Sequence, residues 1–215
     1  MCFSAGASFS AAGALSVIGL LTVKKVPNKR LYLLSLIPLF FALQQFSEGI
    51  VWLALGNKIS EAFILPASYM FIGIAFIAWP IYISIATLVY EKQITRKRLL
   101  YIPFLVGLSL SAYAIFHLVF YEIQAQIVSC HIFYSVKDTA FSYYFTIPYL
   151  IATILPFFIS SIKKMWVLGL VFLMSFIVSF FVYTTWLTSI WCFFAAIISM
   201  LLYWVITSAT PNKAS

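Results

Sequence analysis

Seven long apolar runs divide the chain, and short polar stretches separate them. Each run is long enough, at about 1.5 Å per residue, to cross the roughly 30 Å hydrocarbon core of a bilayer as a helix. We therefore predict an all-α, integral membrane bundle of seven transmembrane helices, forming one domain over residues 1–208 with a polar tail at 209–215. The predicted helices span about residues 5–23, 31–55, 62–90, 99–121, 141–162, 165–185 and 188–207.

Two places along the chain interrupt this regular pattern. The connection over residues 122–140 is longer than the others and contains Cys130 and His131, and we expect a short helix or a re-entrant segment there. Pro80 follows Trp79 inside the third run, where its missing backbone N–H should kink the helix.

Composition and charge agree with a membrane protein. A chain that is 64% hydrophobic and 8% charged cannot surround a core with a charged shell, which excludes a soluble domain. The net charge of +8 does not indicate nucleic acid, because eleven of the thirteen Lys and Arg residues lie in alternate loops and the tail. By the positive-inside rule these segments are cytoplasmic, so the carboxyl end lies inside and the amino end outside. The predicted partner is the lipid bilayer.

Glu48 is the charged residue that falls inside an apolar run, and no other does. An isolated carboxylate in hydrocarbon is costly, so such a residue indicates a functional site. Gln44, Glu48 and Trp52 follow one another at intervals of four, with Gln45 beside them, which places a polar stripe on one side of the second helix. A simpler interpretation makes the glutamines interhelical hydrogen-bonding groups and Glu48 a protonated structural acid.

The topology brings other reactive side chains to the same, outer face as Glu48. These are both histidines and all three cysteines of the chain, namely Cys2, His117, Cys130, His131 and Cys192. The cysteines also suit small buried apolar roles or one disulfide. We predict a polar pocket around Glu48 that a small-molecule or lipid ligand could enter, formed by Gln44, Gln45, His117, Tyr134, Tyr149 and Cys192.

Cys2 carries chemistry of its own. Cysteine is small enough for Met1 to be removed, which would leave a free α-amine next to a thiol. Such an end can chelate a metal through nitrogen and sulfur, or act as a nucleophile with its own amine as base.

We predict a metal site, with zinc as the metal, whose ligands are Cys2, Glu48 and His131. Thiolate, carboxylate and imidazole all bind zinc, and three protein ligands leave a fourth position for an activated water. Glu48 and His131 are then the catalytic candidates, and the expected activity is that of a hydrolase or hydratase acting on a small or lipidic substrate. A site closed by a fourth ligand would be structural or sensory instead.

Two other functions stay open from the sequence. In one, Cys2 is the nucleophile of an acyl-transfer enzyme, with His131 as base and Glu48 as its orienting group. In the other, the protein is not an enzyme but a small-molecule receptor, channel or carrier gated by protonation of Glu48. A retinal protein is excluded because residues 188–207 contain no lysine for a Schiff base.

Four motifs together resemble an uncharacterised family of small bacterial membrane proteins, a domain of unknown function. They are Met1-Cys2-Phe3-Ser4-Ala5, Gln44-Gln45-x-x-Glu48-Gly49-x-x-Trp52, His131-Ile132-x-Tyr134 and Ser189-x-Trp191-Cys192-Phe193. The resemblance implies that Cys2, Glu48 and His131 belong to one pattern, and it implies no activity. It suits a bacterial inner membrane, with the site facing the periplasm or exterior.

Overall fold

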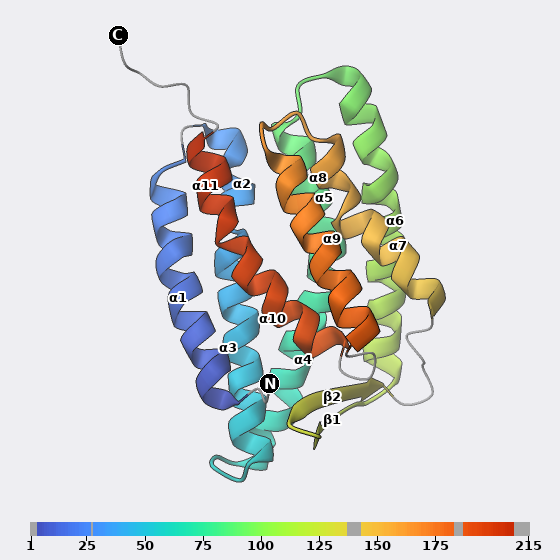
Figure 1. The fold of residues 1–215 in the computed structure, drawn as a ribbon. Helices are drawn as coiled ribbons and strands as arrows, with labels where there is room; N and C mark the ends of the chain where they lie inside the picture. The colour runs from blue at the N-terminus through green and yellow to red at the C-terminus, as the bar shows by residue number, and fades with distance from the viewer. Residues whose placement is uncertain (1–3, 27, 137–142, 183–186, 209–215) are drawn as a thin grey trace.

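The computed structural model describes residues 4–26, 28–136, 143–182 and 187–208, which form a bundle of helices capped at one end by a β-hairpin (Figure 1). The helices of the first half are α1 Ala5–Lys24, η1 Lys29–Leu31, α2 Tyr32–Ser35, α3 Ile37–Leu55, η2 Glu61–Phe63, α4 Ile64–Gly73, η3 Ile74–Ala78, α5 Trp79–Tyr90 and α6 Ile94–Phe120. The second half contains β1 Ile123–Val128, β2 His131–Val136, α7 Tyr143–Thr153, α8 Leu155–Ile159, α9 Met165–Val182, α10 Leu187–Ser199 and α11 Leu201–Ser208.

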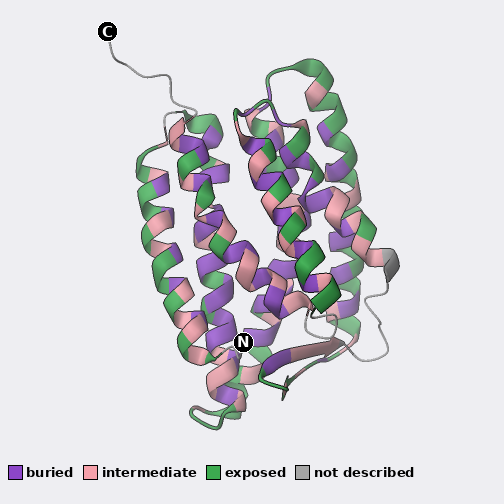
Figure 2. Ribbon diagram, viewed as in Figure 1, coloured by how far each residue is buried: buried purple, intermediate pink, exposed green. Residues whose placement is uncertain are grey.

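Six helical stretches of the described chain are long and apolar enough to cross a membrane. They are Ala5–Lys24, Lys29–Leu55, Glu61–Tyr90, Ile94–Phe120, Met165–Val182 and Leu187–Ser208. Large apolar side chains lie exposed on the outer faces of these helices, Phe181 at 78% and Val119 at 71%, as a hydrocarbon environment allows (Figure 2). The structure thus agrees with the predicted membrane bundle in six of its spans.

The remaining predicted span, residues 141–162, contains a shorter apolar helix, Phe145–Ile159, which is divided at Ile154 between α7 and α8. Pro156 explains the division, because proline has no N–H to donate to the carbonyl four residues earlier. That carbonyl belongs to Ala152, and it accepts a hydrogen bond of 3.2 Å from Ser84 Oγ instead.

The fold is largely helical, as predicted, but the helix or re-entrant segment expected at residues 122–140 is wrong over residues 123–136. The chain forms an antiparallel hairpin in which Ile123 pairs with Val136 and Val128 pairs with His131. Apolar residues alternate with Gln124 and Gln126 along β1, and a period of two favours a strand over a helix. The two-residue turn Ser129–Cys130 has positive φ angles of 47° and 65°, as the tight turns that suit twisted strands require.

A π-helical turn, η3, precedes Pro80 in the third span and separates α4 from α5. Carbonyl groups in this turn accept hydrogen bonds from side chains of other helices, Ala75 O from Tyr149 Oη at 2.6 Å and Ile77 O from Ser111 Oγ at 2.8 Å. The irregular backbone that proline imposes is therefore tied to α6 and α7.

The helices α1 and α3 run antiparallel and pack closely at two glycines. A Cβ atom at Gly19 would lie 2.6 Å from the Leu39 side chain, and one at Gly49 would lie 2.8 Å from the Phe9 ring. The Phe9–Gly49 contact brings the beginning of α1 beside the end of α3, at the hairpin end of the bundle (Figure 1).

Candidate functional site

Glu48 lies in the second half of α3, toward the hairpin end of the bundle, with only 2% of its surface exposed. Ser189, in the first turn of α10, donates a hydrogen bond of 2.5 Å from Oγ to Glu48 Oε1. The carboxyl group therefore joins α3 to α10 through two residues that lie 141 positions apart in the sequence. We call Glu48 and Ser189, together with the neighbouring side chains of Gln45, Trp52 and Tyr134, the Glu48 centre.

Gln44 lies one helical turn deeper than Glu48 and joins four segments through its buried amide. Its Oε1 accepts from Trp79 Nε1 at 2.9 Å, and its Nε2 lies 3.4 Å from Phe71 O and 3.3 Å from Cys192 Sγ. Both ends of the amide are thus occupied by protein groups. The interpretation of Gln44 as an interhelical hydrogen-bonding residue accounts for its position.

Three other side chains near Glu48 bury polar atoms that have no hydrogen-bond partner in the described part of the chain. They are both amide atoms of Gln45, Nε1 of Trp52 and Oη of Tyr134. The Gln45 amide lies beside the Glu48 carboxyl group, but in a looser arrangement than a regular hydrogen bond. Buried polar groups are normally satisfied, so this group of atoms indicates a bound water, ion or ligand.

Tyr134 enters the Glu48 centre from the hairpin strand β2, and its ring stacks on Phe71 with ring centres 4.9 Å apart. Burial raises the pKa of the Tyr134 hydroxyl well above its usual value, and the charges of Glu48 and Cys192 raise it further. The hydroxyl therefore stays protonated and is available as a hydrogen-bond donor close to Glu48.

His131 begins β2 with its side chain buried, and its Nδ1 lies 2.8 Å from Ser129 O. A carbonyl oxygen only accepts hydrogen bonds, so Nδ1 carries a proton in this contact. This second hydrogen bond is the usual way in which a metal-binding histidine is oriented.

Cys2 lies outside the described residues, so its predicted place in the site stays a prediction. The chain is described from Ser4, whose Oγ accepts from Ala7 N at 3.3 Å and caps α1 at the hairpin end of the bundle. No group of three His, Cys, Asp or Glu residues that could hold a metal occurs among residues 4–26, 28–136, 143–182 and 187–208. Glu48 and His131 lie within these ranges and Cys2 does not, so the predicted ligand set stays a prediction.

The other predicted pocket residues divide into two groups. Cys192 is buried against Gln44 and near Glu48, whereas Cys130 is exposed in the hairpin turn, so the two are not paired with each other. His117 packs among rings of its own end of α6, with ring centres 4.2 Å from Tyr113 and 5.3 Å from Tyr121. The ring contacts hold His117 at the end of α6, and its buried Nδ1 has no hydrogen-bond partner in the described part of the chain.

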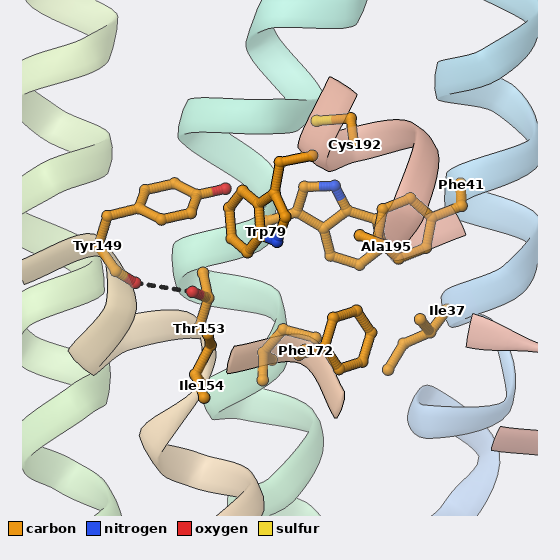
Figure 3. Close-up of a pocket in the computed structure, with 11 residues that line it drawn as sticks. Ile37, Phe41, Trp79, Tyr149, Thr153, Ile154, Phe172, Cys192 and Ala195 are labelled. Atoms are coloured by element: carbon orange, nitrogen blue, oxygen red, sulfur yellow. Dashed lines mark hydrogen bonds between the residues drawn. The ribbon is translucent and has the colours of Figure 1, made fainter. Parts of the chain in front are cut away.

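A cavity of about 40 Å³ is lined mainly by apolar side chains (Figure 3), and its α3 residues Ile37 and Phe41 precede Glu48 by eleven and seven positions. Of the predicted pocket residues, Tyr149 and Cys192 line it. Its other lining residues are Ile37, Phe41, Trp79, Ile83, Thr153, Ile154, Phe172, Trp191 and Ala195. The predicted polar pocket and this apolar cavity are therefore different parts of the molecule that meet at Cys192.

Ser189 is the residue of the Glu48 centre to which sequence analysis gave no role. The sequence feature that indicates Ser189 is its distance from Cys192. Ser189 precedes Cys192 by three positions and therefore lies on the same face of α10. Which helix that face meets depends on how α10 is rotated against α3, and the sequence does not contain that information.

The chain belongs to a Family of unknown function (DUF6629), whose match covers residues 1–215. No curated protein and no solved structure matches the chain.

Proposed function

Because family membership assigns no activity, we propose from the Glu48 centre that this protein is a membrane-embedded metal-binding protein. The metal is zinc, and its protein ligands are Cys2, Glu48 and His131. The observation that carries the proposal is the group of unpartnered polar atoms on Gln45, Trp52 and Tyr134 around a buried carboxyl group. A bound ion with its water molecules would satisfy these atoms, which otherwise each cost free energy.

The orientations of Glu48 and His131 suit such a site. Ser189 donates to Glu48 Oε1 and so holds the carboxyl group in place, and the Ser129 carbonyl accepts from Nδ1 of His131. Ser189 would then orient the carboxylate, as hydrogen-bonded neighbours of metal ligands commonly do.

Hydrolysis or hydration is the chemistry that this ligand set supports. Zinc lowers the pKa of a bound water, and three protein ligands leave a position for that water. Glu48 and His131 would hold the metal at which this water reacts. The Tyr134 hydroxyl and the Gln45 amide would hydrogen-bond a small or lipidic substrate.

We further propose seven transmembrane spans, with the short pair α7–α8 as the fifth. The basic residues at the ends of α1 and α5 and before α9 lie at the end of the bundle opposite the hairpin (Figure 1). With that end in the cytoplasm, the Glu48 centre faces the exterior, which in a bacterial inner membrane is the periplasm.

Metal content of the detergent-purified protein, measured by elemental mass spectrometry, tests the proposal. We expect close to one zinc per chain in the wild type and loss of zinc in Cys2→Ala, Glu48→Gln and His131→Ala. Each variant has a matched control of the same residue type elsewhere in the chain, namely Cys130→Ala, Glu61→Gln and His117→Ala. Cys130 is exposed in the hairpin turn, Glu61 is exposed in η2, and His117 lies among aromatic rings. The controls should retain the metal.

Other results of this experiment would select another function. One such result is a protein without metal whose intact mass shows that Met1 has been removed and whose Cys2 is readily alkylated. It would support the function in which Cys2 is a nucleophile. Absence of metal with an unreactive Cys2 would support a receptor, channel or carrier that depends on Glu48 alone.

A further inference from the structure

The apolar cavity lies between α3, α5, α7, α9 and α10. Aromatic rings supply much of its wall, namely Phe41, Trp79, Tyr149, Phe172 and Trp191 (Figure 3). Its volume of about 40 Å³ is room for roughly three water-sized atoms.

The few polar groups that line the cavity are hydrogen-bonded to protein groups. Tyr149 Oη donates to Ala75 O at 2.6 Å, Thr153 Oγ1 donates to Tyr149 O at 2.7 Å, and Trp79 Nε1 donates to Gln44. A cavity with so few free polar partners does not hold water well and takes apolar groups.

Another face of the α9–α10 pair carries an apolar groove of about 280 Å³. Its lining residues are Val171, Met174, Ser175, Val178, Phe194, Ile197 and Ile198. Several of them are exposed, among them Met174, Val178 and Ile197, so in a membrane the groove contacts lipid chains.

Trp191 separates the groove from the cavity. Its ring lines the cavity, while its Nε1 donates a hydrogen bond of 3.2 Å to Ser175 Oγ, which lines the groove. A rotation of this one side chain would therefore connect an outer surface that contacts lipid with an inner apolar space.

We propose that the alkyl chain of a membrane lipid lies in the α9–α10 groove and inserts its terminal carbons past Trp191 into the cavity. The cavity volume fits the end of a chain and not a whole ring or headgroup, and the groove outside supports the rest of the chain. The inference does not depend on a metal at Glu48.

The chain end would come close to the Glu48 centre. Phe41, which lines the cavity, precedes Glu48 by seven residues of α3, a rise of about 10 Å. On α10, Ala195 and Cys192 line the cavity and Ser189 binds Glu48. The cavity and the Glu48 centre therefore share the same two helix faces.

Photolabelling tests the proposal with a long-chain fatty acid that carries a diazirine at its methyl end. In the wild type, illuminated in lipid nanodiscs, we expect adducts on cavity residues such as Tyr149, Thr153 and Cys192, and competition by the unlabelled fatty acid. Ala195→Leu adds three carbon atoms to the cavity wall and should abolish these adducts while leaving those on exposed residues of α9. Ala14→Leu, at an exposed position of α1, is the matched control and should label like the wild type.

Wild-type labelling decides the question even if Ala195→Leu fails to fold. Adducts confined to groove and other exposed residues, or cavity adducts that excess unlabelled fatty acid does not reduce, would overturn the proposal. Labelling of Glu48→Gln separates the two proposals, because loss of zinc with retained cavity adducts would leave the lipid site standing alone.

Discussion

Gln44 shows how a single buried amide can hold several helices of this bundle together. Its hydrogen bonds reach α4, α5 and α10, and both of its polar atoms are occupied. In a hydrocarbon environment such bonds contribute modestly when formed, but an unpaired buried donor is costly.

Gln44→Leu should therefore destabilise the protein by about 1–3 kcal/mol, because Trp79 Nε1 loses its acceptor. Unfolding in mixed micelles would measure the change. The double-mutant cycle with Trp79→Phe supplies the control, since the second substitution should cost less in the Gln44→Leu background than in the wild type. Additive costs would show that the two side chains do not interact.

Two glycines in spanning helices give a contrasting pair of substitutions. A Cβ atom at Gly107 would lie 2.1 Å from Pro80 O, a backbone atom, whereas one at Gly73 would have nothing within 4 Å. Gly107→Ala should destabilise the bundle by about 1–3 kcal/mol or more, because α5 and α6 must separate. Gly73→Ala should be neutral or stabilising by up to about 1 kcal/mol. Equal thermal stabilities of the two variants would contradict this helix packing.

At the scale of single elements, the hairpin and the broken fifth span are where sequence and structure differ. The strands of the hairpin are six residues each, too short for their alternation to stand out beside apolar runs of twenty or more. Its turn is Ser129–Cys130 and not the Asn-Gly pair that usually marks such a turn in a sequence. The sequence shows Pro148 and Pro156 in the fifth run. It does not show that Ser84 of α5 donates to the Ala152 carbonyl, which Pro156 leaves without a backbone donor where the helix is divided at Ile154.

The connection between α5 and α6 is fixed to the connection between α8 and α9 by Glu91. Its carboxylate accepts from Lys92 N, Gln93 N, Ser161 N and Ser161 Oγ at 2.8–3.1 Å. Burial alone would raise the pKa of Glu91, but the hydrogen bonds, largest from the Gln93 and Ser161 backbone, outweigh it, and the pKa lies below its usual value.

A carboxyl group whose pKa is lower in the folded state stabilises the fold above its unfolded pKa and loses that contribution as pH falls through the folded value. Glu91→Gln should therefore be less stable than the wild type at pH 7, by about 1–3 kcal/mol. The difference should begin to shrink as the pH falls below about 4.5 and should disappear only below the lower, folded pKa of Glu91. Melting temperatures across this range would measure it. Glu61→Gln, at an exposed position, should match the wild type throughout, and a pH-independent deficit in Glu91→Gln would exclude a role for its charge.

For the whole molecule, apolar runs and basic loops predict six spans closely, because a membrane helix must satisfy its backbone internally and be apolar over its full length. Glu48 was predicted as the centre of a site because an isolated acid stands out in an apolar run. Its partners Ser189, Gln45 and Tyr134 were not all predictable, because side-chain convergence depends on the rotation of each helix and on a hairpin that the sequence did not reveal.

The proposed orientation makes Cys130 accessible from outside the cell. In a Cys2→Ser background, a membrane-impermeant maleimide added to intact cells should label the protein at Cys130, which is exposed, and not at Cys192, which is buried. Cys130→Ser should lose the label, and a tag fused after Ser215 should react with antibody only after permeabilisation. Labelling of Cys130 only in opened cells would reverse the topology.

The central proposal is a metal ion bound by Glu48, His131 and the amino-terminal Cys2, and X-ray absorption at the zinc edge of the purified protein tests it most directly. We expect one sulfur neighbour at about 2.3 Å and nitrogen or oxygen neighbours at about 2.0–2.2 Å, with the sulfur replaced by a lighter atom in Cys2→Ser. A protein without zinc, or a zinc shell that is the same in the wild type, Cys2→Ser and Glu48→Gln, would contradict the metal centre.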